Sequence, residues 1–184
     1  MKKNLWMTAL GVCLLVAGAA FAVSACDSSD DSGRKVTFKK MELEFGYAVS
    51  DDLLKVADIK LTYVDPAGTG EEVVEELKAT SWSKKFEATT LPASFSIAVT
   101  ASLKSDFTFD KTSYALSCEA TEIFREYGSD NKVHWSEGPD VDREEQVATT
   151  EAELTSFLTL LNRTYAYVVA VDEEDGGYDV TDND

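Results

Sequence analysis

The stretch that decides the fold runs from Phe95 to Leu103 and reads FSIAVTASL. Its odd-numbered residues are apolar, and all but one of its even-numbered residues are Ser or Thr. Successive side chains of a β-strand point to opposite faces of the sheet, so this period of two predicts a strand with one buried face and one wet face.

The same alternation extends outward in both directions along the chain. It predicts further strands over residues 36–49, 57–63, 73–77, 81–86, 114–127 and 133–135. In the first of these, the apolar phase changes near Lys39 and Lys40, which predicts a β-bulge there. Turn residues follow at 65–68, and residues 128–131 predict a hairpin loop.

One helix is expected to interrupt the strands. Thr150 and Glu153 have the spacing of a capping box, and the apolar residues that follow share one helical face. These residues are Leu154, Phe157, Leu158 and Leu161. The next segment, Tyr165 to Val171, is apolar on both faces, which predicts a central strand with the helix or a loop over its outer side.

The pattern predicts a mainly β fold, an antiparallel two-layer β-sandwich of seven or eight strands with one short late helix. We expect residues 34–171 to form this domain. Residues 172–184 are rich in carboxylates and contain a Gly-Gly pair, so they are expected to form a mobile acidic tail.

The charge of the chain excludes one class of function. The 184 residues contain 34 Asp and Glu against 17 Lys and Arg, a net charge of -17. So acidic a surface would repel phosphates, and nucleic acid is therefore not expected as a partner.

The N-terminus has the layout of a secretory signal. Lys2 and Lys3 precede an uncharged apolar stretch that ends in small residues at Ala25. The stretch is also long enough to span a bilayer, so an uncleaved transmembrane anchor is the alternative. Residues 23–26, Val23-Ser24-Ala25-Cys26, resemble the lipobox of bacterial lipoproteins. The resemblance implies that Val23, Ser24 and Ala25 are read as a cleavage signal, that residues 1–25 are removed, and that Cys26 is lipidated.

Residues 26–33 form an acidic tether in which Asp27, Asp30 and Asp31 follow the cysteine. The tether is similar to the export signal of surface lipoproteins of Bacteroidota, which implies an outer-membrane protein of the cell envelope that faces outside. A plain spacer and inner-membrane retention are the alternatives. The domain also resembles the immunoglobulin-like or transthyretin-like sandwiches of many small lipoproteins, by analogy of fold class alone.

Candidate catalytic residues are few. His134 is the only histidine, which excludes a site built from several histidines. Cys118 shares the apolar phase of its strand, whereas His134 lies in the opposite phase to Val133 and Trp135, so the two side chains are not expected to form a nucleophilic pair. We therefore expect no enzyme, no catalytic residue and no cofactor. With Cys26 lipidated, Cys118 has no disulfide partner.

Two kinds of binding site can be considered. The tail offers carboxylates for calcium, but their spacing does not fit an EF-hand loop, so no metal site is expected. These residues are Asp172, Glu173, Glu174, Asp175, Asp179, Asp182 and Asp184. Trp82 and Trp135 could stack on sugars, yet each lies in the apolar phase, which favours core packing; Tyr127 and Tyr178 are the better candidates for a ligand.

Two function classes remain, and the sequence does not choose a ligand-binding residue for either. The first is a non-enzymatic binding or accessory module, anchored to the membrane through Cys26, for an envelope protein or a glycan. The second is a structural or chaperone-like subunit of an envelope assembly that uses an exposed strand edge.

Overall fold

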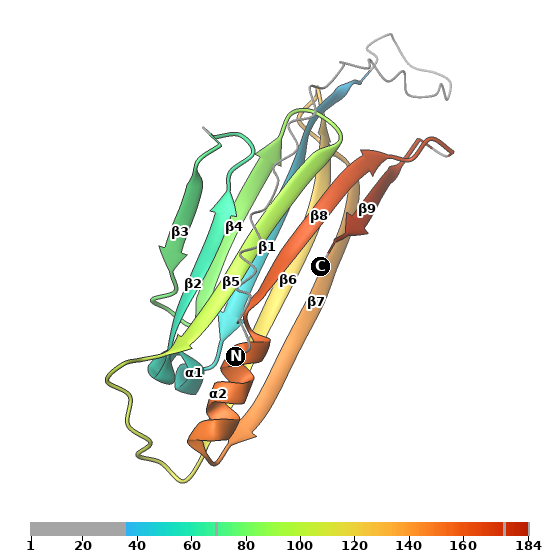
Figure 1. The fold of residues 1–184 in the computed structure, drawn as a ribbon. Helices are drawn as coiled ribbons and strands as arrows, with labels where there is room; N and C mark the ends of the chain where they lie inside the picture. The colour runs from blue at the N-terminus through green and yellow to red at the C-terminus, as the bar shows by residue number, and fades with distance from the viewer. Residues whose placement is uncertain (1–35, 69, 175, 184) are drawn as a thin grey trace, which may run out of the picture.

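The computed structural model describes residues 36–68, 70–174 and 176–183. They form two antiparallel sheets, as Figure 1 shows. The four-stranded sheet has the order β4 (Ser81–Ala88), β1 (Phe38–Val49), β6 (Tyr114–Gly128) and β7 (Val133–Ala148). The five-stranded sheet has the order β3 (Glu72–Glu76), β2 (Ala57–Val64), β5 (Ala93–Leu103), β8 (Arg163–Val171) and β9 (Tyr178–Asp182).

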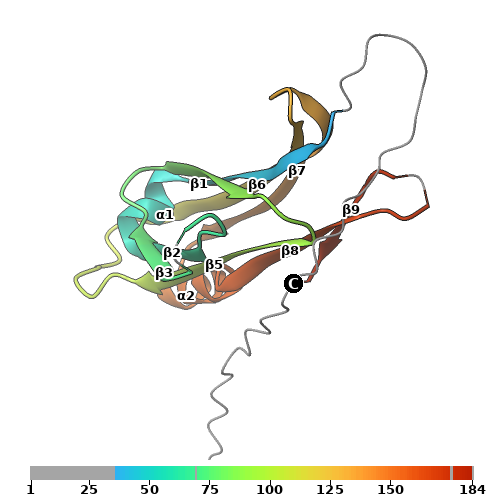
Figure 2. The ribbon, with the colours of Figure 1, turned by 90° about the horizontal axis from the view of Figure 1, so that it is seen from above.

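The two sheets stack as two layers, which Figure 2 shows from above. The predicted mainly β sandwich is therefore confirmed, and β9 adds a strand to the eight that the sequence indicated. The core lies between the layers and is built from the alternating apolar residues. Ile97, at the centre of the stretch that decided the fold, is fully buried, as are Phe45, Leu61 and Tyr114.

Both helices lie at the same end of the sandwich in Figure 1. The predicted late helix is α2 (Glu151–Leu160), and its capping box is present: the Glu153 N–H donates to Thr150 Oγ1 at 3.2 Å, and the Thr150 N–H donates to Glu153 Oε2 at 3.1 Å. A second helix, α1 (Asp51–Val56), was not predicted from the sequence; it has six residues and is capped by Ser50. So short a helix leaves little apolar periodicity to detect.

The local irregularities follow the sequence. The register between β1 and β6 shifts between Phe38 and Lys40, which confirms the predicted bulge. The hairpin at 128–131 is also confirmed, because the Asn131 N–H donates to the Gly128 carbonyl at 2.9 Å. Asn131 has a φ of 63°, a left-handed conformation that Asn tolerates better than most residues.

Two expectations about the end of the chain need correction. In the segment 172–184, where we expected a mobile tail, Tyr178–Asp182 forms β9 and pairs with β8, because Tyr178 and Val180 pack against the core. Strand β8 lies between β5 and β9, so it is an interior strand as expected. The expected cover over its outer side is not found among the described residues: α2 packs against β5 and β7 instead.

Candidate functional site

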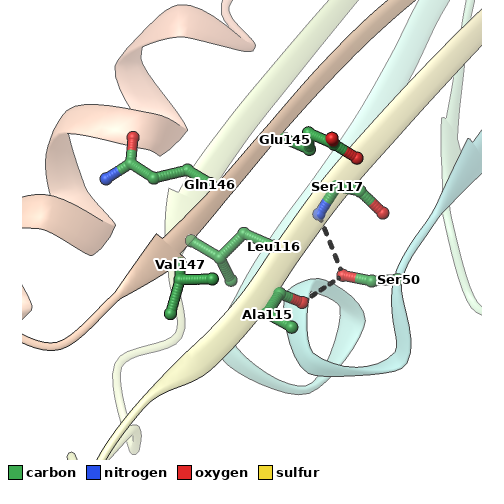
Figure 3. A pocket seen from close by; sticks show the side chains of 7 residues that line it. All are labelled: Ser50, Ala115, Leu116, Ser117, Glu145, Gln146 and Val147. Carbon is green, nitrogen blue, oxygen red and sulfur yellow. Dashed lines mark hydrogen bonds between the residues drawn. The ribbon is translucent and has the colours of Figure 1, made fainter.

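Two adjoining hollows lie near one end of the four-stranded sheet. The larger has a volume of about 500 Å³ and is shown in Figure 3. It is lined by Ser50, Ala115, Leu116, Ser117, Glu145, Gln146 and Val147. The smaller, of about 180 Å³, is lined by Ala48, Val49, Ser117, Cys118, Glu119 and Arg143. Because both include Ser117, they form one shallow trough beside β7.

The floor of the trough is fixed by Ser50, the residue that caps α1. Its Oγ donates to the Ala115 carbonyl at 2.9 Å and accepts from the Ser117 N–H at 3.1 Å (Figure 3). The same oxygen accepts from the Leu53 N–H at 3.2 Å, and the Ser50 N–H donates to the Ser117 carbonyl at 2.9 Å. These bonds join the segment that follows β1 to β6. The side chains of Ala115 and Ser117 on β6 are short, so the floor of the trough lies below its surroundings.

The wall of the trough is β7. Here Arg143, Glu145 and Val147 carry longer side chains than the floor, and Arg143 pairs with Glu145 at 3.0 Å. Val147 is 62% exposed and, like the 56% exposed Val141 of the same strand, adds apolar surface to this edge. The trough therefore forms because the short Ala and Ser side chains of β6 lie beside the longer side chains of β7.

Strand β7 is also the longest strand edge of the described chain. It has 16 residues and, among the described strands, pairs with β6 alone. The other three edge strands, β4, β3 and β9, have eight, five and five residues. From 140 to 145 it carries four carboxylates against one guanidinium, at Asp140, Asp142, Glu144, Glu145 and Arg143. The edge is therefore long, open and acidic.

On the inner face of β7, an ion pair connects this strand to the five-stranded sheet. Arg163 of β8 pairs with Asp142 of β7 at 2.6 Å. The Arg163 guanidinium also lies 5.1 Å from the ring of Tyr165, a cation–π distance. Burial raises the pKa of the neighbouring Cys118 thiol, so this cysteine is neutral near pH 7 and a poor nucleophile.

The structure does not bring Cys118 and His134 together. Cys118 is opposite Glu144 in the β6–β7 ladder, and the far end of the ladder pairs Tyr127 with Val133. Nine residues of β6 at about 3.3 Å each separate these positions by about 30 Å. His134 is exposed at the hairpin and shares a hydrogen bond of 2.8 Å with Asp130.

The candidate aromatic residues are all at least half-buried. Trp82 donates to Glu75 at 2.8 Å, and Trp135 packs on Tyr178 with 5.3 Å between ring centroids. Tyr127 lies under the ammonium of Lys40, 4.6 Å from its ring centroid. In the described part of the chain, the exposed large apolar side chains are Val and Leu, so no aromatic platform faces solvent.

The chain matches no protein family, no curated protein and no solved structure. Evidence on function therefore comes from the exposed faces and edges of the two sheets. Within the described ranges, no helix is long and apolar enough to cross a bilayer, and no three His, Cys, Asp or Glu side chains are placed to hold a metal ion. The lipobox residues Val23 to Cys26 and the tether acids Asp27, Asp30 and Asp31 lie outside the described residues.

Two glutamates on the inner face of β6 were not predicted from the sequence. Glu122 accepts a hydrogen bond of 3.0 Å from the Tyr167 hydroxyl, and burial raises its pKa. Glu126 is only 5% exposed, and burial raises its pKa as well. Both continue the apolar phase of Cys118 beyond Ala120, so extending that phase along the strand could have found them.

Proposed function

We propose that this protein is a membrane-anchored, non-enzymatic binding module that holds an extended segment of a partner protein along β7. The observation that carries the proposal is the position of the trough: both hollows lie against the longest strand edge of the described chain. An edge strand presents free N–H and C=O groups, and an added strand can pair with them.

The trough supplies specificity to such pairing. Alternate side chains of an added strand would lie on the outer face of the sheet, beside Glu145 and Val147. The low floor at Ala115 and Ser117 lies on β6, two strand spacings or about 10 Å from an added strand, so a long partner side chain would have to cross Glu145 or Val147 to enter the trough. Backbone pairing would thus give affinity, and the trough would select long side chains that can reach it.

The acidic edge favours a segment that carries Lys or Arg. Opposite charges steer association and fix the register of binding, whereas a second acidic strand would be repelled. A glycan is the weaker candidate, because sugar binding commonly uses an exposed aromatic ring, and the described aromatic residues are packed.

A pull-down from membranes of the source cells tests this proposal. The variant Glu144→Lys/Glu145→Lys reverses the charge of the β7 edge, and Glu72→Lys/Glu76→Lys makes the matched change on the edge strand β3. We expect the wild type and the β3 variant to retain the same protein and the β7 variant to lose it at least tenfold. Equal retention by all three, or retention of a purified polysaccharide instead, would overturn the proposal.

The open edge also supports a second candidate, a structural or chaperone-like subunit of an envelope assembly. In that case the added strand would come from a neighbouring subunit and would remain in place. Competition with excess unlabelled protein separates the two candidates: a binding module exchanges its partner, whereas an assembled subunit does not.

The anchor is proposed from the resemblance of Val23 to Cys26 to a lipobox. Two or three acyl chains at Cys26 would hold the domain on the membrane, since one chain alone binds only reversibly. Detergent phase partitioning of Cys26→Ala tests it: the variant should move to the aqueous phase and remain folded. If it still enters the detergent phase, the uncleaved transmembrane anchor is the correct interpretation.

Surface exposure is proposed from the tether. Replacing Asp27, Asp30 and Asp31 with Ala keeps the lipobox but removes the acids that resemble an export signal. Protease treatment of whole cells should then no longer reach the domain. Unchanged cleavage would show that the tether is a spacer.

A further inference from the structure

The outer face of the five-stranded sheet carries a patch without charged side chains, which we call the neutral face. This sheet is the layer nearer the viewer in Figure 1. The neutral face consists of Thr62, Val64, Val74, Ser94, Ser96, Ala98, Thr100, Thr164, Ala166, Val168, Ala170 and Thr181. Every one of these side chains is exposed or half-buried.

The register of the sheet brings these residues into one patch. Ala98 of β5 is opposite Thr62 of β2 on one side and Thr164 of β8 on the other. Val168 of β8 is opposite Ser94 and Thr181, which carries the patch to β9. Charged residues of this face lie only around the patch, at Asp58, Lys60, Glu72, Glu76 and Asp179.

A charge-free face is unusual on this molecule. Charged residues make up 28% of the chain, and the net charge is -17. The outer face of the other sheet is built differently: there Glu42 is nearly buried among Lys40, Lys85 and Arg125. The neutral face also includes the half-buried Ala and Val side chains of β8, over which no helix or loop of the described residues lies.

We propose that the neutral face binds the neutral face of a second copy of this chain. Two strongly acidic molecules repel each other wherever carboxylates meet, and this face is where the repulsion is least. A charged partner would gain no ion pair from it. Its small side chains form a flat surface, and two such sheets can pack about 10 Å apart around a two-fold axis.

The size of the neutral face sets the strength of this contact. Five strands about 4.8 Å apart and six or seven residues of about 3.3 Å span about 20 Å by 20 Å at the widest, so the neutral face covers at most about 400 Å². A standard interface buries about 800 Å² on each partner. The dimer should therefore be weak and in exchange with the monomer, and it should be favoured when copies are concentrated, as on one membrane.

Disulfide trapping tests the contact on the purified full chain. Ser94→Cys, Ser96→Cys and Thr100→Cys place one thiol each on the neutral face, while Ser81→Cys and Ser83→Cys place one on the outer face of the other sheet as controls. The native Cys118 is buried, and Cys13 and Cys26 are replaced by Ser in every variant, so that the introduced thiol is the one that reacts. After mild oxidation, at least one neutral-face variant should form a covalent dimer tenfold more than either control. Equal yields at both faces, or none at the neutral face, would overturn the proposal.

A charge exchange tests whether the two faces meet each other. In the background of the most efficient cysteine variant, Ala98→Glu alone and Ala98→Lys alone should each reduce the trapped dimer tenfold. Mixing the two should restore it, because Ala98 lies near the centre of the neutral face, where a two-fold axis brings the same residue of the two copies together. A dimer that survives Ala98→Glu, or a mixture that stays monomeric, contradicts the proposal. If either Ala98 variant fails to fold, the same pair of changes at the exposed Thr100 decides the question.

Discussion

Trp135 of β7 packs on Tyr178 of β9, with 5.3 Å between the ring centroids and 59° between the ring planes. The contact joins edge strands of opposite sheets. Toward the other side of the sandwich, Tyr63 of β2, the strand next to the edge strand β3, lies 6.0 Å from Trp82 of the edge strand β4. Aromatic contacts thus connect the two sheets along both long sides of the sandwich. The residues of β7 that line the trough, 143–147, are nearer the C-terminal end of the strand than Trp135 and take no part in that contact.

Removing Tyr178 should release β9. Tyr178→Ala is expected to lower the free energy of unfolding by about 1–2 kcal/mol, since it removes a half-buried ring and an aromatic contact. Amide hydrogen exchange over 178–182 should accelerate as well. The control Thr181→Ala, on the outer face of the same strand, should change neither measurement. Unchanged exchange in Tyr178→Ala would mean that backbone pairing alone holds β9.

Ile97 should be essential to stability, and His134 should not. Ile97→Ala leaves a cavity in the centre of the core and should cost about 2–5 kcal/mol in urea unfolding. His134→Ala removes an exposed side chain and should stay within about 0.5 kcal/mol. His134→Ala should also leave partner binding unchanged. A tenfold loss of binding, about 1.4 kcal/mol, would place the histidine in a site.

Glu126 should make the fold less stable as the pH rises. Burial raises the pKa of Glu126. The stability that its protonated form contributes is therefore complete below about pH 4.3, the ordinary pKa of Glu, and is lost as the pH rises through the folded-state pKa. Glu126→Gln should therefore be more stable than the wild type at pH 7, and this advantage should shrink toward pH 4. Urea unfolding at both values measures it, with Glu119→Gln as the control for the lost charge. A less stable Glu126→Gln at pH 7 would contradict the interpretation.

The capping box of α2 should contribute measurably to stability. Thr150→Ala removes the Oγ that accepts the Glu153 N–H and should cost about 1 kcal/mol. Thr155→Ala, within the same helix, should cost nothing or stabilise slightly, because Ala has the higher helix propensity. Thermal unfolding of both variants measures the difference. Equal melting temperatures would show that α2 is held by its buried face alone.

Apolar alternation made the interior strands predictable. Ile97 and Leu61 lie in the phases that the sequence assigned to the core, and the phase change near Lys39 and Lys40 located the bulge. The end of β7 was not predictable in this way, because residues 136–148 are mostly polar and exposed. They form a strand because they pair with β6, and a single sequence does not show such pairing.

The trough was not predictable for a related reason. Ser50, Ser117 and Val147 come from three segments that are far apart in the sequence, and only the register between β6 and β7 places Ser117 opposite Glu145. None of these residues has a chemistry that marks a site by itself. The lipid anchor at Cys26 and the surface location remain predictions from the sequence.

Site-resolved photocrosslinking tests β7 as a strand-accepting edge most directly. A photoreactive residue is placed in turn at 141, 143, 145 and 147 of the full chain, and at Ser81 and Ser83 as controls, and is activated in membranes of the source cells. The four β7 positions should give adducts with one polypeptide, and the linked residues should advance along it two at a time, as in a paired strand. Adducts without such a register, adducts with saccharide alone, or equal adducts from the controls would contradict the proposed function.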